Sequence, residues 1–598
     1  MIDFPTHAKL MTMDTTEFYS MRNTFSQPST QLLPNKWDIF ALFLVFSILG
    51  ALAWTGTHLG GDFSFTNLPK ISLSLSYLPL YSLETVLRMF IALFFSFIFS
   101  FIFGALAAKS ERAGRVIIPI IDILQSVPIL GYLSILIVAF VAIFPGSLLG
   151  PQFAAIFAVF TSQVWNMTLS FYQSLRTIPK ELNEAASMYQ LSAWQRFWKL
   201  EVPFSMPGLL WNAMMSMSGG WFFVVASEAI SVGNHEVMLP GIGSFIQVAL
   251  NDGNSSAIIW AIVAMLIVIL LYDQLLFRPL VAWSEKFVVT DIQEQSQSSW
   301  FLNVMKRAPL MRRFSLWCAI QTDRIININT LKKRPYYGKS HLYSDQPPST
   351  INKAIWQLSL FLSIVLFIYI TWQFIYDGTR ITFSETLHVF ILGFYTGLRV
   401  FILIILCSFI WVPIGIWVGT RPKLAQTIQP IAQILAAFPA NLLYGPFAIL
   451  VAAFSLNFEI WCAPLMILGT QWYILFNVIA GASAIPQELK LASKNLQLKG
   501  WTKWRKYLLP SIFPFYVTGA ITAAGGSWNA SIVAEVIDWQ HKQYSATGLG
   551  EYITNNTTLG HMPEVALGVI VMCCWVTIVN RLFWRRLYRY AETRFKME

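Results

Sequence analysis

Two stretches of the sequence decide its organisation. Residues 178–194 read IPKELNEAASMYQLSAW, and residues 485–501 read IPQELKLASKNLQLKGW. The Ile-Pro pair, the Glu-Leu pair and the closing tryptophan recur at a constant offset of 307 residues. A fixed offset between such motifs predicts that the chain contains two copies of one structural unit.

The repeat extends well beyond these stretches. Upstream, the offset is 311 residues, and it relates Thr85, Leu87, Arg88, Gly104, Pro119 and Pro128 to Thr396, Leu398, Arg399, Gly415, Pro430 and Pro439. Downstream, the offset of 307 relates Pro203, Pro207, Trp221, Glu228, Gly241 and Gly243 to Pro510, Pro514, Trp528, Glu535, Gly548 and Gly550. Chance does not hold one register across so many Pro, Gly and Trp positions, so we infer a tandem duplication.

The composition is that of a membrane protein. Of the 598 residues, 56% are hydrophobic and only 12% are charged, whereas soluble domains contain roughly 25% charged residues. This deficit excludes an ordinary soluble enzyme, a disordered chain and a nucleic-acid-binding domain. The formal charge of +11 lies in the loops between apolar runs. The five cysteines include no CxxC pair and predict neither a disulfide framework nor a metal site.

Apolar runs long enough to cross a bilayer need about 20 residues. The sequence contains six such runs in each copy, near 37–56, 85–108, 116–144, 153–173, 205–232 and 256–277, then 354–376, 389–419, 427–455, 459–480, 512–537 and 563–583. We therefore predict an all-α polytopic membrane protein built from two tandem six-helix repeats, with about twelve transmembrane helices. An even number of spans gives both copies the same orientation.

The distribution of Lys and Arg predicts the orientation, because short cytoplasmic loops are enriched in both. One side of the predicted bundle contains most of them, including Lys109, Arg112, Arg176, Lys180, Arg421, Lys490, Lys494, Arg505 and Arg585. Both termini are therefore expected in the cytoplasm. The predicted division is a cytoplasmic segment 1–36, a first six-helix domain 37–278, a basic linker 279–353, a second domain 354–584 and a basic tail 585–598.

The linker between the copies combines basic and aromatic residues. Lys306, Arg307, Arg312 and Arg313 alternate with Trp300, Phe301, Phe314 and Trp317. Such a segment suits the surface of an anionic leaflet, where charge and apolar contact both stabilise binding. A solvated tether is the alternative, and the sequence does not decide between them.

The loop at 178–203 predicts a short helix outside the membrane. Pro179 suits a first helical turn, Glu181 and Glu184 favour a helix N-terminus, and the pair Ala185-Ala186 permits close packing. Such a helix could fit a groove on another protein, or it could be a connector that lies on the membrane.

This loop resembles the EAA loop of the permease subunits of binding-protein-dependent ABC importers. The first copy matches that pattern at Pro179, Glu181, Leu182, Glu184, Ala185, Ala186 and Pro203, and the second copy at Pro486, Glu488, Leu489, Ala492 and Pro510. The second copy departs from it at Leu491 and Ser493. Both copies have glutamine, Gln190 and Gln497, where the family usually has glycine. Because glutamine tolerates positive φ poorly, this departure weighs against the tight turn that follows the helix in the family.

The resemblance implies a function and a set of partners. In that family, the loop forms a coupling helix seated in a cleft of a cytoplasmic ATPase. No GxxxxGK[ST] phosphate-binding loop occurs in this sequence, so ATP and Mg²⁺ are expected on a separate ATPase dimer and no cofactor is expected in this chain. A periplasmic substrate-binding protein and membrane lipid are the other expected partners, and the bacterial inner membrane is the expected location.

One segment of the second copy resembles a branch of the family. Trp528-Asn529, Glu535 and the following Gly548-Leu549-Gly550 are similar to permeases for nitrate, sulfonates, taurine and bicarbonate, and the first copy retains Trp221 and Glu228. The resemblance implies a small solute as the substrate; an anion fits this branch, which also has members with cationic or organic substrates.

Ionisable and amide side chains within predicted spans are costly and become candidates for function. They are Arg88, Arg399, Asp122, Glu228, Glu535, Gln163 and Gln471. An Arg–Glu pair within each half would offset the cost of burial, or the two arginines could lie near the pathway mouth and attract an anion. The glutamines could donate hydrogen bonds to a pathway wall, or they could join helices.

Two other functions compete with the importer. A secondary transporter with six plus six helices would work without an ATPase, but it would need charged residues at mid-membrane, where Asp122 is almost alone. A membrane scaffold or enzyme is the third possibility. The sequence shows no nucleophile triad, paired catalytic carboxylates or cofactor motif, and His235 has no second histidine at ligand spacing.

Overall fold

The computed structural model describes residues 36–58, 71–125, 127–232, 235–287, 299–327, 381–483, 485–539 and 542–595, together with Leu362, Val365 and Tyr369. The chain forms two compact units. The first contains residues up to Leu49 and Trp300–Ile325, and the second contains Gly50–Ser299 and Ile326–Glu598. Both sequence repeats therefore lie in the second unit.

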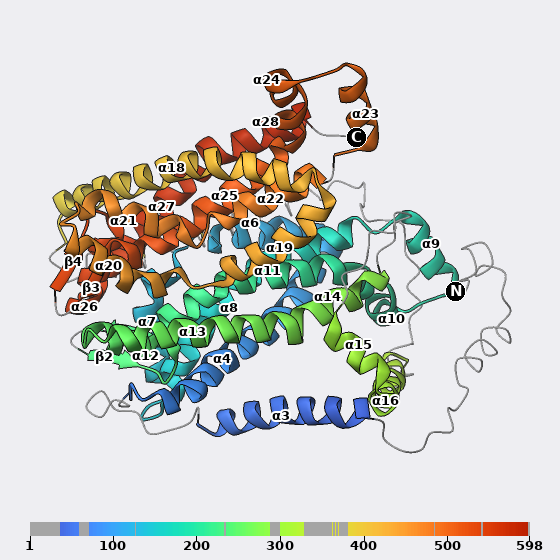
Figure 1. Ribbon diagram of the computed structural model, residues 1–598, viewed down its shortest axis with the longest axis horizontal. Helices are drawn as coiled ribbons and strands as arrows, with labels where there is room; N and C mark the ends of the chain where they lie inside the picture. Colours follow the sequence, from blue (N-terminus) through green and yellow to red (C-terminus); the bar gives the residue numbers. More distant parts are fainter. Residues whose placement is uncertain are drawn as a thin grey trace. The chain divides into compact units, whose positions relative to one another are not determined.

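Helices dominate the first repeat (Figure 1). In chain order its elements are η1 (Leu75–Tyr77), α4 (Leu78–Phe99), η2 (Ser100–Gly104), α5 (Ala105–Lys109), α6 (Glu111–Leu124), α7 (Ile129–Ile143), α8 (Leu149–Arg176), α9 (Lys180–Met188), α10 (Ala193–Arg196), η3 (Phe197–Glu201), α11 (Val202–Glu228), β1 (Ala229–Val232), β2 (His235–Met238), α12 (Ile242–Asn251), α13 (Ser255–Tyr272), η4 (Asp273–Phe277), α14 (Arg278–Ser284) and η5 (Glu285–Phe287). Strands β1 and β2 form an antiparallel hairpin.

The second repeat follows the same order. Its elements are α18 (Phe383–Gly419), α19 (Pro422–Ala437), η6 (Ala440–Leu443), α20 (Tyr444–Ala453), α21 (Phe458–Leu468), α22 (Trp472–Ser483), α23 (Gln487–Asn495), α24 (Gly500–Lys503), η7 (Trp504–Leu508), α25 (Leu509–Ala534), β3 (Val536–Trp539), β4 (Lys542–Ser545), α26 (Leu549–Leu559), α27 (Met562–Val579), η8 (Asn580–Trp584) and α28 (Arg585–Phe595). The hairpin β3–β4 corresponds to β1–β2, so the all-α class and the duplication are confirmed apart from these two short hairpins.

The structure contains fewer continuous helices of bilayer-spanning length than the twelve transmembrane helices predicted. Within the described residues, six continuous helical stretches are long and apolar enough to span a bilayer, or up to eight if two bent helix pairs each count as one span. The six are Leu75–Lys109, Ala193–Glu228, Ser255–Ser284, Phe383–Gly419, Gly500–Ala534 and Met562–Ala591. The run at 354–376 lies outside the described residues, apart from Leu362, Val365 and Tyr369.

Local breaks explain three of the six predicted runs that are not among these stretches, whereas the run at 153–173 lies in the continuous helix α8. The run at 116–144 divides into α6 and α7 before Pro128, and the run at 427–455 bends by 77° between α19 and the segment Ala440–Ala453. The run at 459–480 bends by 45° between α21 and α22. Proline removes a backbone donor and clashes with the preceding turn, so Pro128 and Pro439 are natural positions for the two matched breaks.

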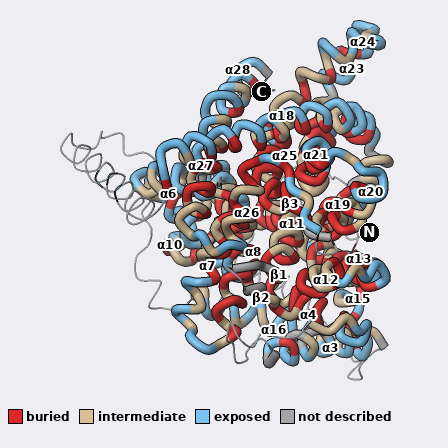
Figure 2. The backbone as a smooth tube through the Cα atoms, turned by 90° about the vertical axis from the view of Figure 1, so that its left-hand side faces the viewer, coloured by how far each residue is buried: buried red, intermediate tan, exposed pale blue. Residues whose placement is uncertain are grey.

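Within each repeat, helices pack closely where a glycine lies at a crossing. A Cβ on Gly104 would lie 2.8 Å from Cδ1 of Phe171, and a Cβ on the matched Gly415 would lie 2.7 Å from Cγ1 of Val478. Small residues at such crossings allow helices to approach in a membrane, where apolar burial drives association only weakly. Figure 2 shows buried residues concentrated between the repeats, with exposed residues on the outer helices.

A reciprocal pair of contacts joins the repeats. The side-chain carbonyl of Asn529 on α25 accepts a hydrogen bond from the Ile129 amide at the start of α7, at 2.7 Å. In the opposite sense, the amide of Asn441 in η6 donates to the carbonyl of Phe222 on α11, at 3.4 Å. Phe222 is the repeat equivalent of Asn529, and η6 is the equivalent of the start of α7. The interface is therefore self-complementary, as expected for a pseudo-twofold arrangement.

The first unit joins the start of α3 (Lys36–His58) to two linker helices, α15 (Trp300–Arg307) and α16 (Pro309–Ile326). The Asp38 carboxylate accepts a hydrogen bond from the Leu310 amide at 2.8 Å, and Ala41, Val304 and Ala308 form a small core. Phe314 and Trp317 on α16 are more than half exposed. An apolar surface of this kind fits the predicted attachment of the linker to lipid, which stays a prediction.

Candidate functional site

The predicted loop helices are present in both repeats. Helix α9 begins after Pro179 and helix α23 begins after Pro486, and each is nine residues long. Both lie at the end of the second unit away from the strand hairpins (Figure 1). We call the end with α9 and α23 the loop end and the opposite end the hairpin end.

Most of each loop helix is open to a partner. Ala186 in the first copy and the equivalent Ser493 in the second are buried, so one small residue fixes each helix to its own repeat. The other motif residues, Glu181, Leu182, Glu184, Ala185, Glu488, Leu489 and Ala492, are exposed or partly exposed. Large side chains beside them are also exposed, namely Met188, Tyr189, Leu491, Leu496 and Trp501. Exposed apolar groups grouped in this way are typical of a protein interaction surface.

The tight turn after each helix forms despite the glutamines. Gln190 and Gln497 both adopt φ of 48°. The amide of Leu191 bonds to the carbonyl of Ala186, and the amide of Leu498 bonds to that of Ser493, both at 3.1 Å. This is the hydrogen-bond pattern of a Schellman motif. The turn that the missing glycine put in question is therefore present, because the hydrogen bonds of the helix C-terminus hold a residue type that disfavours this conformation.

The first loop helix is tied to the bundle by a chain of polar contacts. The Arg196 guanidinium donates to the side-chain oxygen of Asn183 on α9, at 2.6 Å, and lies 3.6 Å from the Glu201 carboxylate in η3. The Lys109 ammonium at the end of α5 also pairs with Glu201, at 2.7 Å. Movement of α9 can therefore pass directly to α5 and to the start of α11.

The second loop has a different chemistry at the same positions. The equivalents of Asn183, Arg196 and Glu201 are Lys490, Lys503 and Leu508, which cannot form that chain of contacts. Residues 487–508 contain six basic side chains and one acidic side chain, whereas residues 180–201 contain three of each. The second loop therefore presents a basic surface, whereas the first presents equal numbers of acidic and basic side chains.

At the hairpin end, the first repeat contains a buried cluster around Arg88. Its guanidinium pairs with the Glu228 carboxylate at 2.6 Å and donates to Gln152 Oε1 at 2.7 Å and to the Pro240 carbonyl at 2.6 Å. Glu84 lies one turn before Arg88, at 3.4 Å. Arg88 and Glu228 are both fully buried, so the arginine is fully engaged within the protein.

Glu228 also organises the backbone that follows the hairpin. One carboxylate oxygen accepts from Thr85 Oγ1 at 2.7 Å, and the other accepts from the Gly243 amide at 2.7 Å. A Cβ on Gly241 would lie 2.3 Å from the carboxyl carbon of Glu228. Glycine is required at this position because the backbone must approach the carboxylate closely.

The second repeat contains the same cluster with one exchange. Glu535 pairs with Arg399 at 3.0 Å, and it accepts from Thr396 at 2.8 Å and from the Gly550 amide at 2.7 Å. Arg399 also pairs with Glu459 at 2.5 Å. Glu459 is the repeat equivalent of Gln152, while the equivalent of Glu84 is Tyr395. Each cluster therefore contains one guanidinium and two carboxyl groups, although the second carboxyl comes from a different helix.

Sequence analysis identified Arg88, Arg399, Glu228 and Glu535 but missed their other partners. Gln152 and Glu459 were detectable from the offset of 307, which relates them at the starts of α8 and α21. Glu84 was detectable because it stands four residues before Arg88, on the same helix face.

The remaining candidates lie apart from these clusters. Gln163 donates to the sulfur of Met217 at 2.9 Å, and Gln471 accepts from the Trp411 indole at 2.9 Å. Both therefore join neighbouring helices. The ring of Trp528 packs against Gly397. Asp122 lies in the last turns of α6, but its side chain lies outside the described part of the structure.

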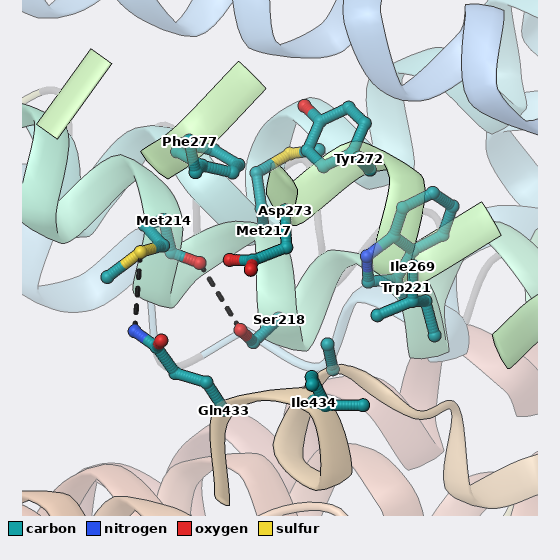
Figure 3. A pocket seen from close by; sticks show the side chains of 11 residues that line it. Met214, Met217, Ser218, Trp221, Ile269, Tyr272, Asp273, Phe277, Gln433 and Ile434 are labelled. Atoms are coloured by element: carbon teal, nitrogen blue, oxygen red, sulfur yellow. Dashed lines mark hydrogen bonds between the residues drawn. The ribbon is translucent and has the colours of Figure 1, made fainter. Parts of the chain in front are cut away.

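A small cavity lies between the repeats near η4 (Figure 3). Its volume is about 30 Å³, and its lining includes Trp221, Asp273 and Gln433. Gln433 donates to the sulfur of Met214 at 3.3 Å, and Asp273 is paired with Arg278 at 2.9 Å. A volume of this size holds about one water molecule, so the cavity does not provide a solute site.

A much larger cavity, the outer cavity, lies between the repeats at the hairpin end. Its volume is about 490 Å³, within the range of ordinary ligand sites. Both repeats line it, the first with residues such as Ser134, Val225, Gln247 and Leu250, and the second with Asn441, Tyr444, Ile532, Thr554 and Thr558. None of Arg88, Arg399, Glu228 or Glu535 is among its lining residues.

Comparison with known proteins matches both repeats to one family. Residues 100–278 and 411–596 match the family described as "Binding-protein-dependent transport system inner membrane component". The chain is 29% identical over 191 residues to the nitrate import permease protein NrtB of Leptolyngbya laminosa, covering 32% of this chain and 62% of that relative.

Two other relatives carry different names. The chain is 29% identical over 164 residues to the bicarbonate transport system permease protein CmpB of a Synechocystis strain, covering 27% of this chain and 55% of the relative. It is 26% identical over 161 residues to the glycine betaine/proline betaine transport system permease protein ProW of Escherichia coli, covering 27% and 43%. The chain thus spans less than two thirds of the length of these curated relatives.

The buried cluster predicts unequal effects of two equivalent substitutions. Arg88→Leu leaves fully buried carboxyl groups without their cation and is expected to destabilise the protein by about 3–5 kcal/mol. Arg399→Leu is expected to cost less, because the side chains of Arg399 and Glu459 are 14% and 44% exposed and water can replace the lost partner. Thermal unfolding of the purified variants measures the difference, and equal losses would contradict this account.

The turns after the loop helices give a second prediction. Gln190→Gly and Gln497→Gly relieve a left-handed conformation and are expected to stabilise the loops by about 0.5–1 kcal/mol. Hydrogen exchange of the α9 and α23 amides should slow. Gln195→Gly is the control, because Gln195 belongs to the capping box with Ser192 and its loss should speed exchange nearby. Faster exchange in Gln190→Gly would refute the assignment of strain.

Proposed function

Since this chain belongs to the family of binding-protein-dependent transport system inner membrane components, we propose that it forms both halves of the translocation pathway of an ABC importer driven by separate ATPase subunits. The observation that supports this most is the pair of exposed loop helices, α9 and α23, at one end of a duplicated bundle. A single-copy permease would supply one such helix, and two ATPase subunits need two.

The proposed cycle begins at the hairpin end. A periplasmic substrate-binding protein delivers a small solute to the outer cavity between the repeats. ATP binding then closes two ATPase subunits at the loop end, and α9 and α23 transmit that closure to the bundle. ATP shifts the equilibrium only if it binds one state of the complex more tightly than the other. This arrangement places both termini and the linker in the cytoplasm of a bacterial cell, with the bundle in the inner membrane.

The contacts of the first loop support the transmission step. The chain from Asn183 through Arg196 and Glu201 to Lys109 joins α9 to two helices of the bundle. In the second loop, exposed Leu491, Leu496 and Trp501 offer apolar contact instead. The two ATPase contacts therefore differ in how directly they connect to the pathway.

The substrate belongs to the class of small solutes that the relatives' names cover, which includes nitrate, bicarbonate and betaines. The anionic alternative comes from the resemblance to nitrate and bicarbonate permeases, and Arg88 and Arg399 were its candidate positive charges at the pathway mouth. Each arginine is paired with two carboxyl groups, so neither cluster offers the net positive charge that would attract an anion.

A secondary transporter is the competing function. It would need a titratable group in the pathway to couple transport to an ion gradient. Among the residues that the structure describes, the lining of the outer cavity includes no carboxylate, lysine or arginine. This favours an energy source on a separate subunit, as in an ABC importer.

Purification from native membranes separates the two functions. The importer predicts that an ATPase with a phosphate-binding loop accompanies the full chain at a stoichiometry of two per permease, and that it is lost when charge is reversed on α9 by Glu181→Lys with Glu184→Lys. Gradient-driven uptake by liposomes that contain this chain alone would overturn the proposal.

The difference between the loops gives a quantitative prediction. Glu184→Ala should reduce the ATPase activity of the complex by roughly the tenfold that a lost contact of 1.4 kcal/mol gives, because α9 connects directly to the bundle. Leu491→Ala, at the equivalent position of α23, should reduce it less. Activities are compared at matched protein levels in proteoliposomes, and equal defects would contradict unequal coupling.

A further inference from the structure

The outer cavity ends at a definite level of the bundle, and the inference drawn from that level rests on the proposed function. Helix α11 begins beside the first loop and ends at its hairpin, and α25 does the same in the second repeat. The lining residues closest to the loop end are Val225 and Ala226 on α11 and Ile532 on α25, with Asn441 of η6 beside them. The next turn toward the loop end therefore decides whether a solute can leave the cavity in that direction.

A much smaller cavity, the inner cavity, lies at that next turn. The same three elements line it, with Phe222 of α11, Ala440 of η6 and Ala530 of α25. Its volume is about 60 Å³, which holds only a few water molecules. A solute that fits the outer cavity therefore cannot pass through the inner cavity unless its walls move.

Aromatic rings form much of this wall. Phe222 and Phe223 come from the first repeat, and Phe438 and Tyr473 come from the second. The rings of Phe222 and Phe223 meet edge to face, with centroids 5.3 Å apart and planes at 88°. Phe438 directly precedes Pro439, at the 77° bend that follows α19. Rings from both repeats therefore converge directly on the loop-end side of the outer cavity.

The two repeats are in close contact at this level. A Cβ on Gly219 of α11 would lie 2.8 Å from the hydroxyl oxygen of Tyr473 on α22. The hydrogen bonds that Asn441 and Asn529 each make with the other repeat lie at the same level, since Asn529 is the repeat equivalent of Phe222. The repeats thus close on each other here, whereas the outer cavity separates them on the hairpin side.

Space reappears on the loop-end side of the rings. Gly525 lies one turn before Asn529 on the same face of α25, and a Cβ there would meet no atom within 4 Å among the described residues. Thr518, two turns further toward the loop end on that face, is exposed. The rings therefore stand between two open regions.

The two repeats supply the rings unequally. The repeat equivalents are not aromatic, because Phe222, Phe223 and Phe438 correspond to Asn529, Ala530 and Val127. Phe223 and its equivalent Ala530 line the same inner cavity, so a large side chain of one repeat faces a small one of the other. Helix α25 therefore has no ring that could replace those of α11.

We propose that Phe222, Phe223 and Phe438 form the inner gate of the translocation pathway, an apolar barrier that retains a solute in the outer cavity until α11 moves. Apolar constrictions exclude water and hydrated solutes. Helix α11 starts directly after Glu201, where the polar contacts from α9 through Arg196 end. Movement of the first loop helix thus reaches two of the three rings along a single helix.

Two thiols on α11, one on each side of Phe222, test the gate without knowledge of the substrate. Ala226 lines the outer cavity and Ser218 lines the inner cavity. Each is changed to cysteine in the full-length chain after its five natural cysteines are replaced. The variants are produced without an ATPase in spheroplasts, and a membrane-impermeant trimethylammonium methanethiosulfonate is added outside. Each modification rate is divided by the rate of the same thiol in the denatured chain.

Ala226→Cys is expected to react at least about tenfold faster than Ser218→Cys, since only the second thiol lies behind a barrier. Adding Phe222→Ala with Phe223→Ala should raise the Ser218→Cys rate by about tenfold or more and leave the Ala226→Cys rate unchanged. Phe157→Ala is the matched control, because it removes a ring that lines an apolar groove on α8 and should leave Ser218→Cys protected.

Two further variants guard against a general loss of structure. Phe222→Trp keeps a large ring and should leave Ser218→Cys protected. Phe438→Ala removes the ring on the opposite wall, and it should expose Ser218→Cys if the double variant of α11 does not accumulate in the membrane.

Equal normalised rates at Ser218→Cys and Ala226→Cys in the parent chain would overturn the gate, and so would continued protection of Ser218→Cys after the rings are removed. A thiol at Ala226 that reacts from neither side of the membrane would also overturn it. If Ala226→Cys reacts only in inverted vesicles, the proposed orientation is wrong, and the same comparison from that side still tests the gate. Absence of an ATPase partner would refute the importer and leave the result on the rings unchanged.

Discussion

The carboxylates of Glu228 and Glu535 are the interactions on which the hairpin end depends. Each lies at the end of a long helix and is fully buried, and each accepts hydrogen bonds from a threonine on a neighbouring helix and from the amide of the second glycine in a Gly-x-Gly segment. Burying a charge without partners is expensive, so every contact must form together. The carboxylate therefore fixes three elements at once: the end of α11 or α25, the helix α4 or α18 at its threonine, and the start of α12 or α26. The hairpins and the cavity wall are held by that arrangement.

The duplication preserved this constraint while its parts changed. In the first repeat, the second acid is Glu84 on α4 and the start of α8 carries the neutral Gln152. In the second repeat, the start of α21 carries Glu459, and Tyr395 stands where Glu84 would be. The count of charges is the same although their positions differ. What is retained is the electrostatic balance around the guanidinium, which leaves neither arginine as a free positive charge for an anion.

The sequence predicted much of this architecture and missed specific parts for physical reasons. Pro179 and Pro486 predicted the starts of α9 and α23, because proline at a helix start is a local effect. An Arg–Glu pair in each repeat was one of two alternatives that the sequence left open, and the structure contains it. The turns at Gln190 and Gln497 were put in question by local propensity, which is outweighed by hydrogen bonds to preceding carbonyls. The breaks near Pro128 and Pro439 were hidden because an apolar run looks the same whether its helix is straight or bent. The outer cavity was invisible, because it arises only where two repeats meet.

The two ends of the bundle differ in how far the repeats have diverged, and this difference has a mechanical consequence. At the hairpin end, the clusters and the reciprocal contacts of Asn529 and Asn441 keep the repeats nearly equivalent. At the loop end, one helix is joined to the bundle by ion pairs and the other is surrounded by lysines. Both repeats line the outer cavity, so a change in one repeat alters a wall that the other repeat completes. In the proposed importer, each loop helix contacts a separate subunit, and neither loop is constrained by the other. The loops could therefore diverge, and in the proposed importer a nearly symmetric pathway is driven by two unequal connections.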